Sequence, residues 1–228
     1  MPGGNRGVGN HGGKNFCSRC SHLRTPTEKS GTTRKQRTDL SLLDRSVTLL
    51  FLLRRKGGYM ELTDREWKAF RIEDIFECTK GIYLPTEKVV EGNIPFITAK
   101  VGNNGLNRFI GNGILFHGNR ITIEKIRLSA YYQPIGFYCS HDVSVIWNKH
   151  INKYNALFIT TMIMRNSDKY SYGRQAQLNV VKREYIMLPV TDDGQPDYVF
   201  MEQFIKDMML KKYFQYDEFQ KVRNRQYE

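Results

Sequence analysis

The sequence of 228 residues lacks a long hydrophobic run, and its longest uninterrupted apolar stretch is Leu49–Leu53. Crossing a bilayer as a helix takes about 20 apolar residues, so we do not expect a membrane protein. A long basic stretch precedes this segment and no small-residue cleavage site follows it, so a secretory signal is not expected either. We therefore expect a cytoplasmic protein.

Cysteine is also scarce. Cys17, Cys20, Cys78 and Cys139 are too few and too scattered for a disulfide framework, which fits a reducing compartment. Cys17 and Cys20 have the spacing of half a zinc site, but no second Cys or His pair follows at a suitable distance. No metal site is therefore expected. Cys78 and Cys139 lie among apolar neighbours and are predicted to be small core residues.

Common signatures of catalysis are missing as well. The sequence has no Gly-x-Ser-x-Gly, no His-Glu-x-x-His and no Walker A Gly-x-x-x-x-Gly-Lys. Pro196-Asp197 resembles the start of a Pro-Asp…Glu-x-Lys nuclease motif, but no Glu-x-Lys follows it. We therefore expect a non-catalytic protein that holds no cofactor itself, and a small standalone nuclease is the enzyme alternative.

Acidic residues are rare in the first part of the chain. Residues 1–60 carry 12 Lys+Arg against 3 Asp+Glu, whereas the rest of the chain carries 23 against 20. Residues 1–38 also have almost no large apolar side chain, so residues 1–59 are predicted to form a disordered basic leader. Such a leader suits phosphate binding. Alternatively it is not translated, because a ribosome-binding sequence and a start codon can encode residues 56–60.

From Trp67 onward the pattern is that of an α/β (α+β) domain with a mixed sheet. Short segments rich in β-branched and aromatic residues, separated by Gly, Pro or Asn, predict strands. These strands are residues 67–72, 94–99, 120–123, 130–133, 143–147 and 185–190. A stripe of Tyr154, Leu157, Phe158, Thr161 and Met162 predicts a helix over residues 151–163 whose stripe faces a core.

A second helix is predicted near the C-terminus. Pro196 suits a first helical turn, and the helix should run from Asp197 to at least Lys212. Its predicted partner-binding face is Phe200, Met201, Phe204, Ile205 and Met208. This face could close the domain's own core or pair with a partner helix, and both remain open. We expect the domain over residues 60–193 and the helix over residues 194–228.

Several loops of this domain interleave cations, amides and aromatics. Arg can bind guanine through two hydrogen bonds, Asn and Gln bind adenine, and Lys binds phosphate. The predicted phosphate contacts are Lys100, Arg120, Lys125 and Lys169. The predicted base contacts are Asn103, Asn104, Arg108, Arg127, Gln133 and Arg174, with the aromatic Tyr170 and Tyr172 beside them. For each cluster alone, a solvated surface is the alternative.

An ordered series of motifs resembles the specificity subunit of type I restriction–modification systems. The series includes Trp67-Lys68-x-Phe70-x-Ile72-x-Asp74-Ile75-Phe76, Ile94-Pro95-Phe96-Ile97-Thr98-Ala99, Gly118-Asn119-Arg120-Ile121-Thr122-Ile123 and Gly194-x-Pro196-Asp197-x-x-Phe200-Met201-Glu202. It covers about residues 67–206 and corresponds to one target recognition domain and one helix, roughly half of a full subunit. The family often has a Gly-rich turn where this chain has residues 124–129.

The resemblance implies a non-catalytic module that reads double-stranded DNA for a methyltransferase subunit and a restriction subunit. S-adenosylmethionine, ATP and magnesium would then bind to those partners. Because the family's long helices pack as an antiparallel coiled coil, residues 197–219 are expected to form a homodimer or to dock the methyltransferase. Otherwise the chain is a fragment of a longer gene. A degenerate half-subunit that binds the methyltransferase without reading DNA is the remaining alternative.

Overall fold

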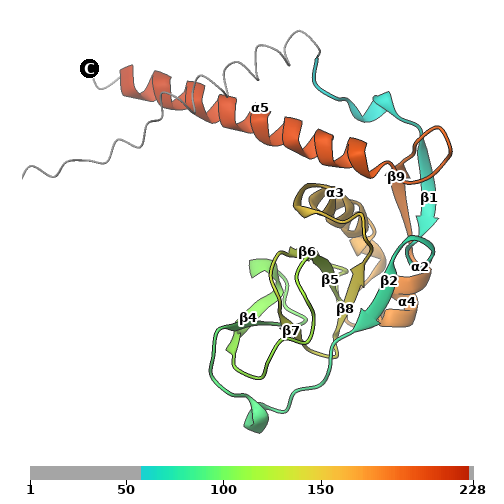
Figure 1. Ribbon diagram of the computed structural model, residues 1–228, viewed down its shortest axis with the longest axis vertical. Helices are drawn as coiled ribbons and strands as arrows, with labels where there is room; N and C mark the ends of the chain where they lie inside the picture. Colours follow the sequence, from blue (N-terminus) through green and yellow to red (C-terminus); the bar gives the residue numbers. More distant parts are fainter. Residues whose placement is uncertain (1–57, 226–228) are drawn as a thin grey trace, which may run out of the picture. The chain divides into compact units, whose positions relative to one another are not determined.

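The computed structural model describes residues 58–225 (Figure 1). They belong to the second of the two units into which the chain divides, Arg45–Glu228. Nearly all of the predicted basic leader, including Cys17 and Cys20, lies outside the described residues. Within residues 58–225, no helix combines the length and the hydropathy needed to cross a membrane.

The β structure consists of three small sheets. The largest is antiparallel and has the strand order β2 (Glu77–Lys80), β8 (Val143–Trp147), β5 (Arg120–Glu124), β6 (Ala130–Gln133). The second has the order β4 (Leu106–Ile110), β3 (Ile94–Ile97), β7 (Tyr138–Cys139), and β3 and β7 are parallel. The third pairs β1 (Trp67–Arg71) with β9 (Tyr185–Pro189), which brings the two ends of the domain together.

Four α-helices complete the described residues. They are α2 (Ile72–Ile75), α3 (Lys153–Met164), α4 (Leu178–Arg183) and α5 (Tyr198–Arg225). Short 3₁₀ turns lie at Leu62–Asp64, Thr86–Lys88, Asn103–Gly105 and Ser167–Lys169. The mixed class with a C-terminal helix is thus confirmed. Of the two cysteines predicted for the core, Cys139 is buried and Cys78 is only half-buried.

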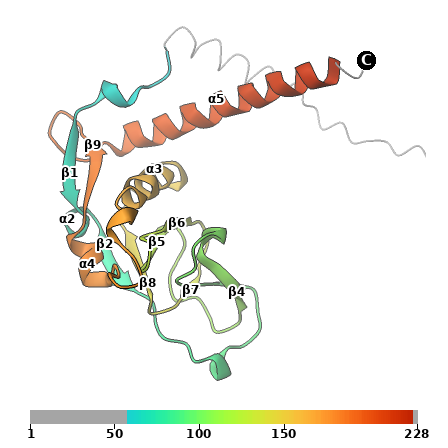
Figure 2. The same ribbon diagram turned by 180° about the vertical axis from the view of Figure 1, so that it is seen from behind.

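Helix α3 lies between α5 and strand β6 (Figures 1 and 2), and it also contacts β9. Burial on two sides makes the predicted single stripe wrong in part. Leu157 is 39% exposed and Thr161 is exposed, whereas Ile159 and Ile163 are fully buried in the core. Phe158 does face inward, as predicted.

The first turns of α5 belong to the core of the domain. Phe200 and Met201 are only 1% and 0% exposed, and Phe204 and Ile205 are partly buried against the same cluster. Contrary to the prediction, Phe200 and Met201 are therefore not available to a partner helix. Met208 is 46% exposed and begins an accessible stripe. The remaining exposed members of this α5 stripe are Met209, Tyr213, Tyr216, Phe219 and Val222.

Replacing Met201 by Ala should therefore destabilise the domain. We expect Met201→Ala to lower the free energy of unfolding by about 2–5 kcal/mol, because it leaves a cavity in the core. Met208→Ala, which removes the same side chain from an accessible position, should change it by only about 0.5 kcal/mol. Denaturant unfolding followed by circular dichroism measures both, and equal losses would contradict the placement of Met201 in the core.

Candidate nucleic-acid interface

Two loops that carry predicted DNA contacts lie side by side. They are the turn between β5 and β6, residues 125–129, and the loop after α3, residues 167–174, and we call them the paired loops. The backbone N–H of Ala176 donates to the carbonyl oxygen of Lys125 at 2.7 Å, next to the second loop. Both loops line a cavity of about 560 Å³, whose walls include Arg127 and Tyr172. The fold thus joins two of the predicted clusters.

The first of the paired loops takes its shape from the buried side chain of Glu124. Glu124 is 2% exposed, and its carboxylate accepts hydrogen bonds from the backbone N–H groups of Ile126 (2.7 Å), Arg127 (2.6 Å) and Ser129 (3.1 Å). Leu128 has a φ of 56°, a left-handed conformation that favours glycine, and its side chain is fully buried. Burial and the three hydrogen bonds thus hold a turn that often contains glycine in the resembled family.

The second of the paired loops is held by another buried carboxylate, Glu184. Tyr170 donates a short hydrogen bond to Glu184 Oε2, and Lys169 Nζ lies 2.8 Å from Oε1. Tyr170 is only 8% exposed, so it supports the loop and does not offer its ring to a base, contrary to the prediction. Burial and the bond to Glu184 raise the pKa of Tyr170 to about 12. The phenol therefore remains a hydrogen-bond donor at neutral pH.

Other side chains of the paired loops face solvent. Reciprocal backbone hydrogen bonds between Ser171 and Arg174 close a tight turn, which leaves Tyr172 80% exposed. Arg174 and Arg127 are both exposed, and Arg127 lies at the cavity. Lys125 forms an ion pair with Asp142 at 2.7 Å, so part of its charge is already neutralised within the domain. Tyr172, Arg174 and Arg127 are thus the accessible recognition candidates here.

A second surface lies on residues 100–108, beside the edge strand β6. Asn103 and Asn104 have φ values of 46° and 54°, between two glycines that also have positive φ. Asn104 donates to Gln133 Oε1 at 3.2 Å, and Gln133 Nε2 donates to Asn104 O at 3.0 Å. Gln133 is 4% exposed and also donates to Thr122, so the prediction that it reads a base is wrong. Its amide holds this turn against β6.

On this second surface Lys100, Asn103 and Arg108 remain exposed. Asn104 is exposed as well, but its side-chain amide donates to the carbonyl oxygen of Tyr132 and to Gln133 within the domain. Among the described residues, the side chain of Arg108 donates one hydrogen bond, to Oδ1 of the neighbouring Asn107 at 3.1 Å. These three exposed side chains are therefore accessible to a ligand.

Arg120 lies at the other end of the sheet from the paired loops and is paired with Gln133 of β6. It begins β5, whereas Lys125 follows the end of the same strand, so the two lie at opposite ends of the sheet. Its guanidinium lies over the ring of Trp147, 4.5 Å from the centroid. Burial lowers the pKa of Arg120, and the nearby Glu77 raises it. Arg120 is thus better explained as a packing residue than as a phosphate contact.

Sequence reasoning missed the two carboxylates that shape the paired loops. Glu124 and Glu184 carried no motif, and their one signal was an acidic residue placed beside apolar strand residues. Among residues 58–225, no group of three or more His, Cys, Asp or Glu side chains is arranged to hold a metal ion. The arrangement offers cationic, amide and aromatic groups on loops, which suits binding.

Comparison with known proteins identifies the family. Residues 64–215 match the sequence model of the type I restriction modification DNA specificity domain. Since this match covers most of the chain, the protein belongs to that family, and the resemblance seen in the sequence is confirmed.

One relative and one solved structure illustrate the likeness. The type II restriction enzyme BgcI specificity subunit S.BcgI of Heyndrickxia coagulans is 34% identical over 152 residues, which is 64% of this chain and 45% of that protein. The type I restriction-modification S subunit from M. genitalium has a similar fold, with a TM-score of 0.52 at 15% identity. That match covers 80% of this chain and 49% of the other. This chain thus spans about half the length of each.

The Glu184 contacts predict a loss of stability in acid. Burial alone would raise the pKa of Glu184, but the hydrogen bonds from Lys169, Tyr170 and the Tyr185 backbone outweigh it and lower the pKa. Stabilisation by this group is therefore present above its ordinary pKa of 4.5 and is lost as the pH falls through the lowered value.

At pH 7, Glu184→Gln should lower the free energy of unfolding by about 1–3 kcal/mol, because it removes charge-assisted hydrogen bonds. The difference between the variant and the wild type should shrink as the pH falls below 4.5. Urea unfolding across this pH range measures it, with Glu87→Gln, an exposed glutamate, as the control. A difference that does not change with pH would contradict the role of Glu184.

Proposed function

We propose that this chain is a DNA-sequence recognition subunit of a restriction–modification system and has no chemistry of its own. The paired loops carry this proposal. Glu124 holds the backbone of the first loop, and Glu184 binds the side chains of Lys169 and Tyr170 in the second. Arg127, Tyr172 and Arg174 extend outward. Rigid loops that present cationic and aromatic groups suit base reading, since base contacts need fixed positions.

The accessible side chains divide into two proposed roles. Lys100 and Lys169 are proposed to bind phosphates, because lysine acts as a point charge on the DNA backbone. Arg127, Arg174 and Arg108 are proposed to bind base edges, where a guanidinium can donate two hydrogen bonds to guanine. Lys169 is 49% exposed even though it pairs with Glu184, so it can still reach a phosphate.

The proposed partners follow from the family. A methyltransferase subunit that uses S-adenosylmethionine would modify the DNA, and a restriction subunit that uses ATP and magnesium would cut it. Both reactions would occur in the cytoplasm. The second candidate function is to bind the methyltransferase without reading DNA. The accessible apolar stripe on α5 favours this candidate.

The α5 stripe is proposed to pair with a second copy of this chain. Its apolar side chains recur at three- and four-residue intervals along the helix, as in helices that pack lengthwise. A symmetric pair would place two identical recognition domains on one DNA, and the target would then be a palindrome split by a spacer.

The proposal is tested by expressing the full chain with the methyltransferase subunit of the same genome. Sequencing methylated adenines in the host DNA should give one motif that disappears without this chain. A palindromic motif would support the symmetric pair. Methylation that is the same without this chain would contradict the proposal, and copurification with the methyltransferase without any motif would favour the second candidate.

Replacing Arg127 or Arg174 by Ala should relax sequence preference. We expect each change to cost about 1–3 kcal/mol on cognate DNA, because it removes a base contact, and much less on random DNA. Lys100→Ala should weaken binding to both DNAs and reduce the salt slope by about 1. Fluorescence anisotropy with salt titration measures this. Arg183→Ala, an exposed arginine on α4, is the control, and equal effects on both DNAs for all variants would contradict the division.

Placing a charge in the α5 stripe should break the symmetric pair. Tyr216→Glu and Phe219→Glu should weaken self-association at least about tenfold, which corresponds to about 1.4 kcal/mol, because they bury a carboxylate in an apolar interface. Val199→Glu, at an exposed position in the first turn of α5, should leave it unchanged. Sedimentation equilibrium measures the dissociation constants. A monomeric wild type would contradict pairing between copies.

A further inference from the structure

The direction of α5 is fixed at its base, and a small change in this direction moves the far end of the helix by a large distance. The helix has 28 residues, and at a rise of 1.5 Å per residue it is about 42 Å long. Only its first turns are seated in the core. A tilt of about 10° at the base would therefore move the far end by about 7 Å, which is about twice the rise of about 3.4 Å per base pair of DNA.

Apolar packing at the base does not by itself define this direction. Phe204 of α5 meets Phe158 of α3 edge to face, with 5.7 Å between ring centroids, and stacks on Phe200. The hydrophobic effect itself is not directional, and interdigitated side chains restrict packed helices to a few crossing angles with a scatter of about 15–20°. Hydrogen bonds, which do depend on direction, can narrow this range to one angle.

The loop between β8 and α3, residues 148–152, supplies the first of these directional contacts. We call it the clamp loop. Asn148 Nδ2 donates to the hydroxyl of Tyr198 at 2.7 Å, and the ring of His150 stacks on Tyr198, with centroids 4.9 Å apart and planes at 14°. Asn148 also donates to the carbonyl of Ile75, which ties the same side chain to α2.

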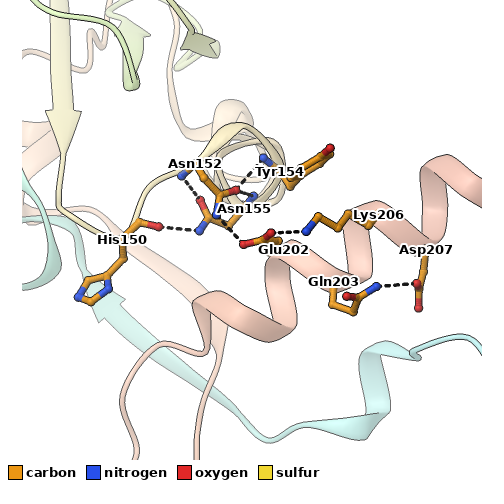
Figure 3. Close-up of polar contacts among 8 residues, drawn as sticks. All are labelled: His150, Asn152, Tyr154, Asn155, Glu202, Gln203, Lys206 and Asp207. Atoms are coloured by element: carbon orange, nitrogen blue, oxygen red, sulfur yellow. Dashed lines mark hydrogen bonds and ion pairs between the residues drawn. The ribbon is translucent and has the colours of Figure 1, made fainter.

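The second contact lies one turn further along α5. Asn152 Nδ2 donates to Glu202 Oε2 at 2.7 Å, and the other oxygen of Glu202 pairs with Lys206 (Figure 3). Lys206 Nζ also lies over the ring of Tyr154 of α3, 4.8 Å from its centroid. Figure 3 shows Glu202 between Asn152 and Lys206.

Asn152 acts on both helices at once. Its oxygen caps α3 by accepting from the backbone N–H groups of Tyr154 and Asn155, at 2.9 and 3.1 Å. Its amide nitrogen binds α5 through Glu202. Because β8 of the large sheet leads directly into this loop, one short segment connects the sheet that carries a recognition loop with α3 and α5.

We propose that the clamp loop, through Asn152–Glu202 and Asn148–Tyr198, sets the spacing between the two half-sites of the DNA target. It does so by holding α5 at one angle to the recognition domain. The inference rests on the proposed function, since it needs DNA reading and pairing through α5. Asn152 and Glu202 are positioning residues, because they act on spacing through α5 and do not touch DNA.

A change at Asn152 can break the α5 contact while keeping the cap. Asn152→Asp preserves the capping oxygen, because Asp and Asn cap helices about equally well, but it places a carboxylate against Glu202. Adding Glu202→Gln supplies an amide that can donate back to the new carboxylate, so the double variant should restore the contact. Gln203→Ala is the control, because Gln203 bonds to Asp207 of the same helix and not to the clamp loop.

The measurement uses the full chain with its methyltransferase and a plasmid library in which the spacer between the half-sites varies. The wild type should methylate one spacer length, and Asn152→Asp should reduce discrimination against lengths one base pair longer or shorter at least about tenfold. The half-site bases should not change. The double variant and Gln203→Ala should discriminate like the wild type.

Unchanged discrimination by a folded Asn152→Asp protein would overturn the inference and leave the proposed function standing. Loss of the same discrimination by the double variant would also overturn it, because the contact would then not be the cause. If the wild type directs methylation to no sequence motif, both the proposed function and this inference are contradicted. Should Asn152→Asp fail to fold by circular dichroism, Tyr198→Phe, which keeps the ring stack but removes the acceptor of Asn148, makes the same test.

Discussion

Helix α3 is buried on two opposite sides, and the packing of the C-terminal helix against the rest of the domain depends on this burial. Ile159 and Ile163 pack into the main core, while Phe158 meets Phe204 of α5. A single helix therefore joins the sheet of the recognition domain to the C-terminal helix. The first turns of α5 share the core of the domain, and only the part from Met208 onward offers an accessible apolar stripe. The hydrogen bonds of Asn152 to Glu202 of α5 and to the backbone of α3 add directional contacts to this apolar packing.

Helices and strands with a strong apolar pattern could be predicted from the sequence. Elements that form only because they pair with or pack on a neighbouring element could not. Strands β6 and β8 and helix α5 have dense apolar or β-branched patterns, and their positions were predicted closely. Strand β2 is short and polar and is a strand because it pairs along β8, while α4 has only six residues. The predicted buried stripe on α3 was wrong in part, because an argument from periodicity assumes that a helix is buried on one side only.

The types of residue in the candidate site could be predicted, but their roles could not. Gln133 and Tyr170 have the chemistry of base readers, yet Asn104 and Glu184, distant in the sequence, turn both into supports. Tyr172, two residues after Tyr170, is 80% exposed because a tight turn closes beneath it. An amide or a phenol can bind DNA or hold a loop, and only its neighbours in space decide between the two.

In the turn between β5 and β6, the residues that determine the backbone differ from the residue that faces solvent, and this separation affects how such a protein can evolve. Glu124 and Leu128 determine the backbone of this turn, and neither faces solvent. Arg127 contributes its backbone N–H to the turn, which any residue except proline can supply. Its side chain can therefore be exchanged without altering these hydrogen bonds, and, under the base-reading role proposed for Arg127, single substitutions there would change the preferred target. The same position is a rational starting point for a retargeting library.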